Sequence, residues 1–343
     1  MLAAHTPRID QAVALQLSES TGRQFPLLDT AQDICGRVAA AYCVATSDAG
    51  QAARLTATFS QLTLADMAGV GSLSAKTARH HTRLHEAEQA CLDLLAELLR
   101  ERRVQSYTGS PRDLIDVLTT TRPDQPVSVE YGARVLKTIL TAARGIPGAA
   151  LAWIIAEIAD NHLLRDRIRS ESAQLAQVVA SGDPHHMPYT HAAVKEILRV
   201  HPPIWLLGRI TAHTTHLDRW TITAGERVLA SPYLIHHDPR WWTEPHHFAP
   251  ERWLHTAAAH THRHAYLPFG GGPRACLGSR LGLLQLTITA AHLARDYDIE
   301  LIDHDHTDTQ HSVLRAPRIR AARLHLREHA APHQRDGTTH PTR

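Results

Sequence analysis

A ten-residue segment near the carboxyl end, Phe269-Gly-Gly-Gly-Pro-Arg-Ala-Cys-Leu-Gly278, holds the residues with the clearest chemical use. Its three successive glycines let the backbone pass close to a flat or bulky group, and Pro273 stiffens the turn. Cys276 stands where we expect loop to give way to a helix over 277–294, whose first amides and dipole stabilise a thiolate. Arg274 adds positive charge nearby. The segment favours an anionic cysteine that acts as a nucleophile or a metal ligand. A buried structural cysteine is the alternative.

Two further motifs stand upstream of this segment. Lys195-Glu-Ile-Leu-Arg199 places Glu196 and Arg199 at i and i+3 of an expected helix, where they can pair on one face. Phe248-Ala-Pro-Glu-Arg-Trp253 carries Arg252 within a stretch rich in Pro, Trp and His. Taken alone, the Glu196–Arg199 pair is typical of a solvated helix surface.

With the three motifs in this order and at these separations, the sequence resembles the cytochrome P450 family. Five positions match the family's haem-ligand loop: Phe269, Gly272, Arg274, Cys276 and Gly278. The resemblance extends more loosely from near Ile9 to near Leu326. It implies a cytochrome P450-like fold, haem b as cofactor and monooxygenase activity.

The resemblance also implies a role for each residue around the haem. Cys276 would be the axial thiolate ligand of the haem iron, pushing electron density onto it. Arg274 and Arg209 stand where family members contact the haem propionates, and a guanidinium suits a carboxylate. Phe269 would pack near the sulfur and tune its exposure.

Glu196, Arg199 and Arg252 resemble the family's buried Glu–Arg–Arg network. Breaking such a network costs several kcal/mol because a charge is left unpaired. A short apolar segment matches one that lines the substrate pocket; it comprises Ile204, Trp205, Leu206 and Leu207. These residues favour a lipophilic substrate such as a terpenoid, with ordinary core packing as the alternative.

One departure from the family pattern concerns the central helix, which usually carries an acid followed by Thr to manage protons at dioxygen. The matching positions here are Gly145 and Ile146, and no acid or Thr lies between Thr141 and Trp153. Ordered water could replace the relay, because water chains carry protons. A mechanism without the relay, or weak coupling of oxygen to substrate, is equally allowed.

The second departure is at the amino end, where the first expected helix resembles one that follows a sheet and three or more helices in the family. Before Ile9 only His5 and Arg8 have side chains suited to haem propionates, and we expect no helix there to hold them. A late start codon, a partial gene or a paralogue that no longer binds haem would each explain this.

The rest of the chain must position these residues, and its periodicity predicts mostly helices. We expect helices over 9–17, 31–44, 73–99, 114–118, 162–180, 189–201 and 277–294, and a long one over 128–160 interrupted at 145–148. A small antiparallel sheet is expected over 209–230, an irregular stretch over 239–268 and closing strands over 299–302 and 313–326. The sequence predicts a mainly α fold with a minor antiparallel β part. We expect one domain over 1–328, followed by a disordered tail at 329–343.

Composition limits the class of protein and the cellular compartment in which we expect it. The 343 residues contain 36 Lys+Arg and 34 Asp+Glu, a net charge of +2 that argues against a nucleic-acid binder driven by bulk charge. Four cysteines without paired spacing indicate a reducing compartment. The amino end has no apolar run typical of a signal peptide, and the longest apolar stretch, 148–158, is too short to span a membrane. We expect a cytoplasmic protein.

The leading hypothesis is a haem-thiolate monooxygenase that inserts one atom of O2 into an apolar small molecule. Its electrons would come from a separate ferredoxin and reductase. The alternative is a truncated or catalytically impaired relative with a binding role or none. We interpret His236-His237 and His246-His247 as loop composition, and His260-Thr-His262-Arg-His264 lacks the partner ligands of a metal site.

Overall fold

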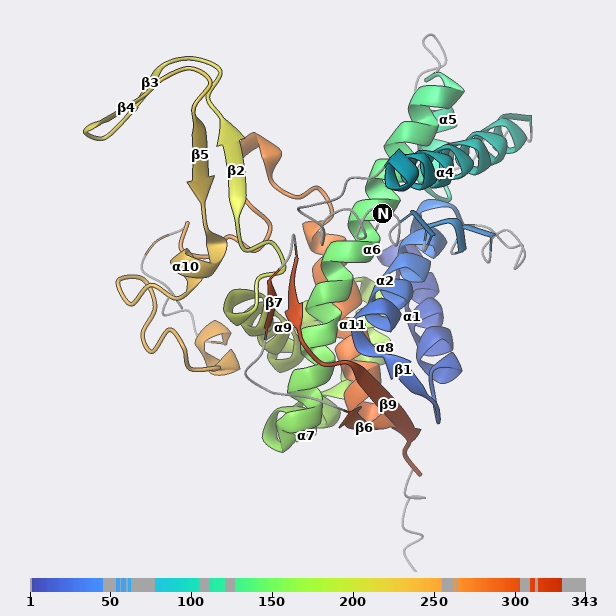
Figure 1. Cartoon of the computed structure of the whole chain (residues 1–343). Helices are drawn as coiled ribbons and strands as arrows, with labels where there is room; N and C mark the ends of the chain where they lie inside the picture. The colour runs from blue at the N-terminus through green and yellow to red at the C-terminus, as the bar shows by residue number, and fades with distance from the viewer. Residues whose placement is uncertain are drawn as a thin grey trace, which may run out of the picture.

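The longest helix, α6 (Val129–Asp160), runs through the centre of the computed structural model (Figure 1). It begins at a cap in which the Ser128 side chain accepts a hydrogen bond from the Tyr131 amide. The helix is continuous through Pro147, so the interruption predicted at 145–148 is wrong. Neighbours hold the helix on several sides here, and one missing backbone donor does not end it.

The described residues are 2–45, 54, 55, 57–59, 61, 62, 78–104, 111–120, 127–254, 262, 264–302, 309–311 and 314–328. The tail at 329–343 and residues 73–77 of one expected helix lie outside them. The other helices are α1 (Leu2–Glu19), α2 (Leu27–Cys43), α4 (Ala78–Val104), α5 (Leu114–Thr120), α7 (His162–Glu171), α8 (Leu175–Ser181), α9 (Pro188–Val200), α10 (Pro232–His236) and α11 (Ser279–Asp296). Short 3-10 turns lie at η1 (Ser172–Gln174), η2 (Pro184–His186), η3 (Pro250–Trp253) and η4 (Gly272–Arg274).

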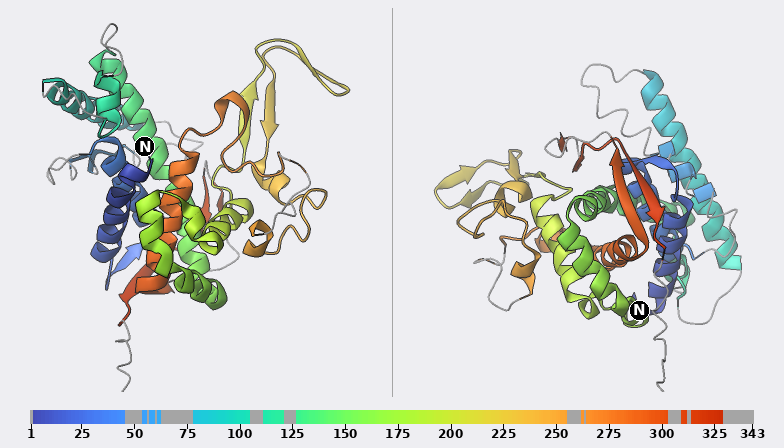
Figure 2. Two further views of the ribbon diagram at one scale, coloured as in Figure 1. Left: turned by 180° about the vertical axis from the view of Figure 1, so that it is seen from behind. Right: turned by 90° about the horizontal axis from the view of Figure 1, so that it is seen from below.

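The strands of the described residues pair in small antiparallel sheets, so the predicted mainly α fold with a minor antiparallel β part is confirmed. One three-stranded sheet has the order β1-β9-β6, from β1 (Gln24–Pro26), β9 (Ala321–Leu326) and β6 (Tyr297–Ile302). The two-stranded sheets pair β2 (Leu207–Ile210) with β5 (Arg227–Ala230), β3 (Thr215–Leu217) with β4 (Trp220–Ile222), and β7 (Thr309–His311) with β8 (Arg315–Pro317). The hairpin of β3 and β4 projects away from the helices (Figures 1 and 2).

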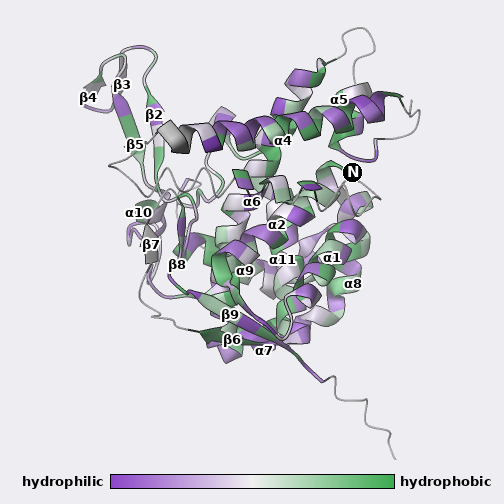
Figure 3. Cartoon of the chain, turned by 45° about the vertical axis from the view of Figure 1, so that its right-hand side comes forward, coloured by the Kyte–Doolittle hydropathy of each residue, from purple (hydrophilic) through white to green (hydrophobic). Residues whose placement is uncertain are grey.

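Helices α2 and α6 approach each other closely at Gly148. A Cβ placed on Gly148 would lie 2.6 Å from the Cα of Gln32, so only glycine allows this approach. At Gly36 of α2 the space is filled by the side chain of Arg144, whose Cγ lies 3.1 Å from an added Cβ. Helix α4 crosses the amino-terminal part of α6, where Leu99 packs on Gly132 (Figure 3).

Two hydrophobic clusters form the core of the described residues. The larger one joins α1, α2, α7, α9 and α11 to the carboxyl half of α6, and the smaller one joins α2, α4 and α5 to its amino half. Among the described helices, α6 alone is long and apolar enough to cross a membrane, which the sequence analysis did not predict. Most of its apolar window is buried against other helices, as in the core helix of a folded domain.

Three other expectations from the sequence need correction. Helix α1 begins at Leu2, so His5 and Arg8 do lie in a helix: His5 packs edge-on against Tyr42, and Arg8 donates a hydrogen bond to the Arg112 carbonyl. The helix expected over 162–180 is divided into α7, η1 and α8. Strand β1 was not predicted, because three residues carry too little pattern and pair only with distant β9.

Candidate functional site

The glycine-rich segment forms a tight loop just before α11. Gly270 and Gly272 have φ angles of 69° and 68°, a left-handed backbone that residues with a Cβ rarely adopt. The Cys276 amide donates a hydrogen bond of 2.9 Å to the Phe269 carbonyl and so closes the loop. Two of the three glycines are therefore required by the backbone itself.

The Cys276 side chain is exposed, which excludes the alternative of a buried structural cysteine. Helix α11 begins at Ser279 with Gly278 as its N-cap, two residues later than predicted. Cys276 therefore lies just before the first turn. The other cysteines differ: burial raises the pKa of Cys43 and Cys91 to about 12, which keeps their thiols neutral. Cys276 is the accessible thiol of the four.

Glu196, Arg199 and Arg252 come together in a buried network, and not at a solvated helix surface. Arg199 binds Glu196 with both Nε and Nη2 at 2.9 Å, and Arg252 Nε binds the same carboxylate at 2.9 Å. The Trp253 indole adds a fourth donor at 2.9 Å. Burial by itself raises the pKa of Glu196, but the Arg199 hydrogen bonds and charge outweigh it, so the pKa is lowered.

The remaining donors of Arg199 hold the irregular stretch that follows α10. Its Nη1 donates to the carbonyls of His236 at 2.8 Å and Pro245 at 2.6 Å, and its Nη2 donates to His247 at 3.1 Å. A guanidinium has five N–H donors, and all five are used here. This explains how a stretch without regular structure keeps one shape.

His236 is a residue that the sequence analysis missed. It is fully buried and bonded through both ring nitrogens, so the interpretation of His236 as loop composition is wrong. His236 lies just before the irregular stretch, where the sequence has no hydrophobic periodicity that would predict its burial. Of the sequence His260 to His264, residues 260, 261 and 263 lie outside the described residues. No cluster of three or more potential metal ligands forms among the described ones.

The predicted propionate ligands are exposed. Arg209 donates to its neighbour, the Gly208 carbonyl, at 2.8 Å, and Arg274 lies on the exposed face of the loop. Phe269 is half-buried, with its ring edge 3.9 Å from the Cβ position of Gly282 in α11. It therefore anchors the loop to the helix that follows.

The four apolar residues after Pro203 are partly exposed, so ordinary core packing does not describe them. Leu206 is 40% exposed, and the other three (Ile204, Trp205 and Leu207) are half-buried. The Trp205 carbonyl accepts a hydrogen bond of 2.8 Å from Ser231, which ties the segment to the start of α10. The segment therefore presents apolar surface.

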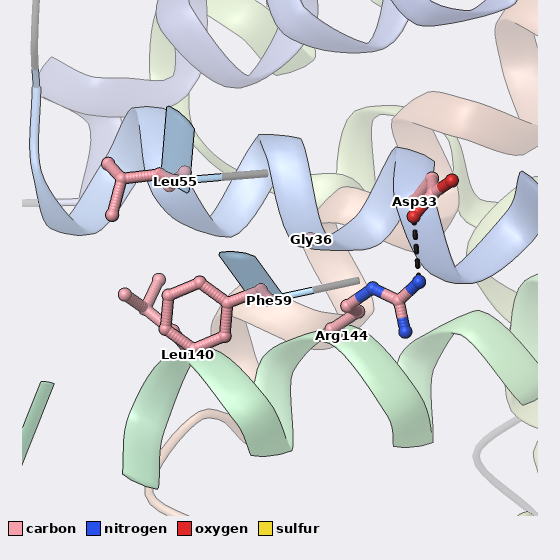
Figure 4. Close-up of a pocket in the computed structure, with 7 residues that line it drawn as sticks. Asp33, Gly36, Leu55, Phe59, Leu140 and Arg144 are labelled. Carbon is pink, nitrogen blue, oxygen red and sulfur yellow. Dashed lines mark hydrogen bonds and ion pairs between the residues drawn. The ribbon is translucent and has the colours of Figure 1, made fainter. Parts of the chain in front are cut away.

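Gly145 and Ile146 lie on a different side of α6 from Arg144. Ile146 is 37% exposed, while Arg144 is buried and bonded to Asp33 at 2.7 Å and Gln32 at 3.2 Å. Figure 4 shows a pocket beside that ion pair. Its lining residues are Asp33, Gly36, Ala40, Leu55, Phe59, Leu140 and Arg144. This pocket includes no residue of the Cys276 loop and adds nothing to the cysteine chemistry.

The residues around Cys276 fit a haem on the thiolate side. A Cβ added at Gly270 or Gly272 would meet nothing within 4 Å, so open space adjoins the loop beside an exposed thiol. Arg274 offers a cation for a carboxylate on the same loop. An exposed thiol on a glycine loop and a buried Glu–Arg–Arg network, both within a mainly helical fold, are the features that the resemblance to haem-thiolate proteins implies.

A sequence model described as Cytochrome P450 matches residues 52–320, so the chain belongs to the cytochrome P450 family. It shares its fold with the retinoic acid bound cyanobacterial CYP120A1, with a TM-score of 0.80 at 22% identity. That superposition covers 95% of this chain and 75% of the other.

Curated relatives include enzymes from bacteria and plants. The chain is 27% identical over 311 residues to cyclooctat-9-en-7-ol 5-monooxygenase of Streptomyces melanosporofaciens, covering 85% of this chain and 67% of that protein. It is 30% identical over 213 residues to cyclooctatin synthase of the same organism, covering 59% and 46%. Salviol synthase of Salvia pomifera is 27% identical over 255 residues, covering 72% and 50%. The chain therefore matches about half to two thirds of these relatives' lengths.

Proposed function

We propose that this chain is a haem-thiolate monooxygenase that inserts one atom of O2 into an apolar small molecule. The observation that carries the proposal is the exposed Cys276 on its glycine loop, in a fold that also contains the buried network of Glu196, Arg199 and Arg252. Cys276 would ligate haem b, with Arg274 and Arg209 as cations for the propionates. Thiolate-ligated haem, when bound, supplies the activation of dioxygen.

The side chains of the protein would bind and orient the haem and the substrate and shield them from water. The reaction needs two electrons and two protons from outside, because the second oxygen atom leaves as water. We assign the electrons to a separate ferredoxin and reductase, which would dock where Arg274 and Arg280 add positive charge. The side chains of Gly145 and Ile146 cannot donate or accept a proton, so proton transfer along α6 would rely on ordered water.

The substrate class we propose is a terpenoid. The partly exposed apolar segment that includes Ile204 and Leu206 favours a lipophilic molecule. The names of cyclooctat-9-en-7-ol 5-monooxygenase and salviol synthase support the same class at 27% identity. Binding would appear as a change in the haem absorption spectrum when terpenoids are added, and alkanes of equal size serve as controls.

A carbon-monoxide difference spectrum of the reduced, haem-reconstituted chain tests the proposal. We expect the absorption band of thiolate-ligated haem in the wild type and its loss in Cys276→Ser. Cys35→Ser is the matched control, because that thiol is buried in the core, and it should leave the band in place. A wild type without the band would overturn the enzyme function.

The second candidate is a family member that binds without catalysis. The observations that favour it are the 95% exposure of Leu277 beside the cysteine and the lack of an acid or Thr at 145 and 146 of α6. The same spectrum separates the two, and product formation with an added ferredoxin and reductase separates catalysis from haem binding.

A further inference from the structure

His236 ends α10, and its ring lies between the aromatic rings of the irregular stretch. The side chain is fully buried, with its ring centroid 5.5 Å from that of Tyr266 and 6.5 Å from that of Trp242. Its Nδ1 lies 3.0 Å from the Arg199 carbonyl oxygen, and its Nε2 lies 2.8 Å from the Leu267 amide nitrogen. Both ring nitrogens therefore bond to backbone.

These partners fix the tautomer. An amide only donates, so Nε2 carries no hydrogen; a carbonyl only accepts, so Nδ1 carries one. The ring must be neutral, since a second proton would remove the acceptor for Leu267. Burial lowers the pKa of His236 to about 3, and this keeps the ring in that form.

The two bonds link the buried network to the cysteine loop. Arg199 donates through Nη1 to the His236 carbonyl at 2.8 Å, so the two residues hold each other by side chain and backbone. On the other side, the Leu267 carbonyl accepts from the Gly270 amide at 3.2 Å. The Leu267 side chain also lies 3.5 Å from the Cβ position of Gly271. A shift of Leu267 would therefore move the glycine run that presents Cys276.

We propose that His236 is the positioning residue of the Cys276 loop, acting through the Leu267 amide while it is held by the Arg199 carbonyl. The ring fixes where the loop begins relative to α9. Its consequence for haem ligation rests on the proposed function, whereas the positioning is a property of the protein alone.

Two substitutions separate the two bonds. Glutamine places an oxygen acceptor near the position of Nε2 and keeps the bond from Leu267. Asparagine places a donor near the position of Nδ1 and keeps only the bond to Arg199. His237→Gln is the matched control, because the neighbouring ring bonds the Tyr233 carbonyl through Nδ1 at 2.8 Å.

Amide hydrogen exchange in the haem-free chain is the first readout. We expect His236→Asn to speed exchange of the Leu267 amide about tenfold, the scale of one lost hydrogen bond. His236→Gln and His237→Gln should stay near the wild-type rate. Labelling of Cys276 by a thiol reagent should change in the Asn variant alone. Equal exchange and labelling in both His236 variants would overturn the positioning role.

The carbon-monoxide spectrum of the reconstituted chain is the second readout. We expect the Asn variant to lose a larger share of the thiolate band than the Gln variant at equal haem content. If the wild type lacks the band, the proposed function fails, and exchange alone decides the role of His236. If the variants do not fold, nitrogen-15 spectra of the wild-type ring decide it: a hydrogen on Nε2 would overturn the proposal.

Discussion

At the scale of single residues, Arg199 shows how much one side chain organises. Each of its five N–H groups has an acceptor: two carboxylate oxygens of Glu196 and the carbonyls of His236, Pro245 and His247. Lysine could supply three donors at most, without the planar fork. The buried charge is compensated only in this arrangement.

Arg199→Ala should therefore destabilise the chain by about 3–5 kcal/mol, since it leaves buried acceptors and part of Glu196 unpaired. We also expect the variant not to retain haem. Urea unfolding and haem content after purification measure the two effects. Arg227→Ala, at an exposed arginine of β5, is the control and should stay within about 0.5 kcal/mol of wild type. An unchanged haem content in Arg199→Ala would refute the role of the network.

The four cysteines give a second prediction at this scale. In the folded, haem-free chain we expect one fast-reacting thiol and, after denaturation, four, because only Cys276 is exposed and burial raises the pKa of Cys35, Cys43 and Cys91. Titration with a chromogenic disulfide reagent counts them. Cys276→Ser should remove the fast phase, and a fast phase that persists would contradict the exposed position of Cys276.

At the scale of elements, α2 and α6 show why glycine spacing matters. At Gly148 the neighbouring backbone leaves no room for a Cβ, whereas at Gly145 the nearest atom to an added Cβ is Leu314 Cδ1 at 3.7 Å. Two glycines three residues apart on one helix thus have opposite requirements. Helix propensity alone would favour alanine at both.

Gly148→Ala should lower the free energy of unfolding by about 1–3 kcal/mol, because α2 must move away from α6. Gly145→Ala should raise it by up to about 1 kcal/mol, the usual gain of alanine over glycine inside a helix. Urea unfolding of the pair tests the contrast. Equal effects at both positions would show that the helices do not approach closely at Gln32.

At the scale of the whole molecule, His292 ties the first helix to the last. Its Nε2 lies 2.8 Å from Asp10 of α1, and its Nδ1 lies 3.2 Å from Asp296 at the end of α11. Burial by itself lowers the pKa of His292, but the two carboxylates outweigh it, and the pKa is raised above 6.5. Folding therefore favours the charged imidazolium, which bridges segments that are 282 residues apart.

This bridge predicts a pH dependence of stability. A pKa raised on folding gives a contribution that is complete below pH 6.5, the unfolded value, and is lost as pH rises through the folded value. The contribution of His292 to the free energy of unfolding should fall across that range, so Asp10→Asn should cost more stability at low pH than at high pH. Urea unfolding at about pH 6 and about pH 9 measures the difference. Parallel pH profiles in both chains would contradict the charged bridge.

Local features of this protein can be read from its sequence. The three motifs around Glu196, Arg252 and Cys276 identified the family, and the 3.6-residue periodicity gave most helices, with α6 beginning where Ser128 caps it. The pattern over 209–230 also marked the small antiparallel sheets of β2 with β5 and of β3 with β4. Such signals are readable because backbone conformation, capping and helix faces depend on neighbours within a few residues.

Burial and long-range partners, in contrast, are visible only in the folded structure. It decided that the Glu196–Arg199 pair is buried, that α6 continues past Pro147 and that His236 bonds two distant backbone groups. It also decided that Cys276 is exposed. Solvent exposure and hydrogen-bond partners depend on elements that are far apart in the chain. An isolated histidine or an i, i+3 ion pair has the same local pattern whether it faces water or the core.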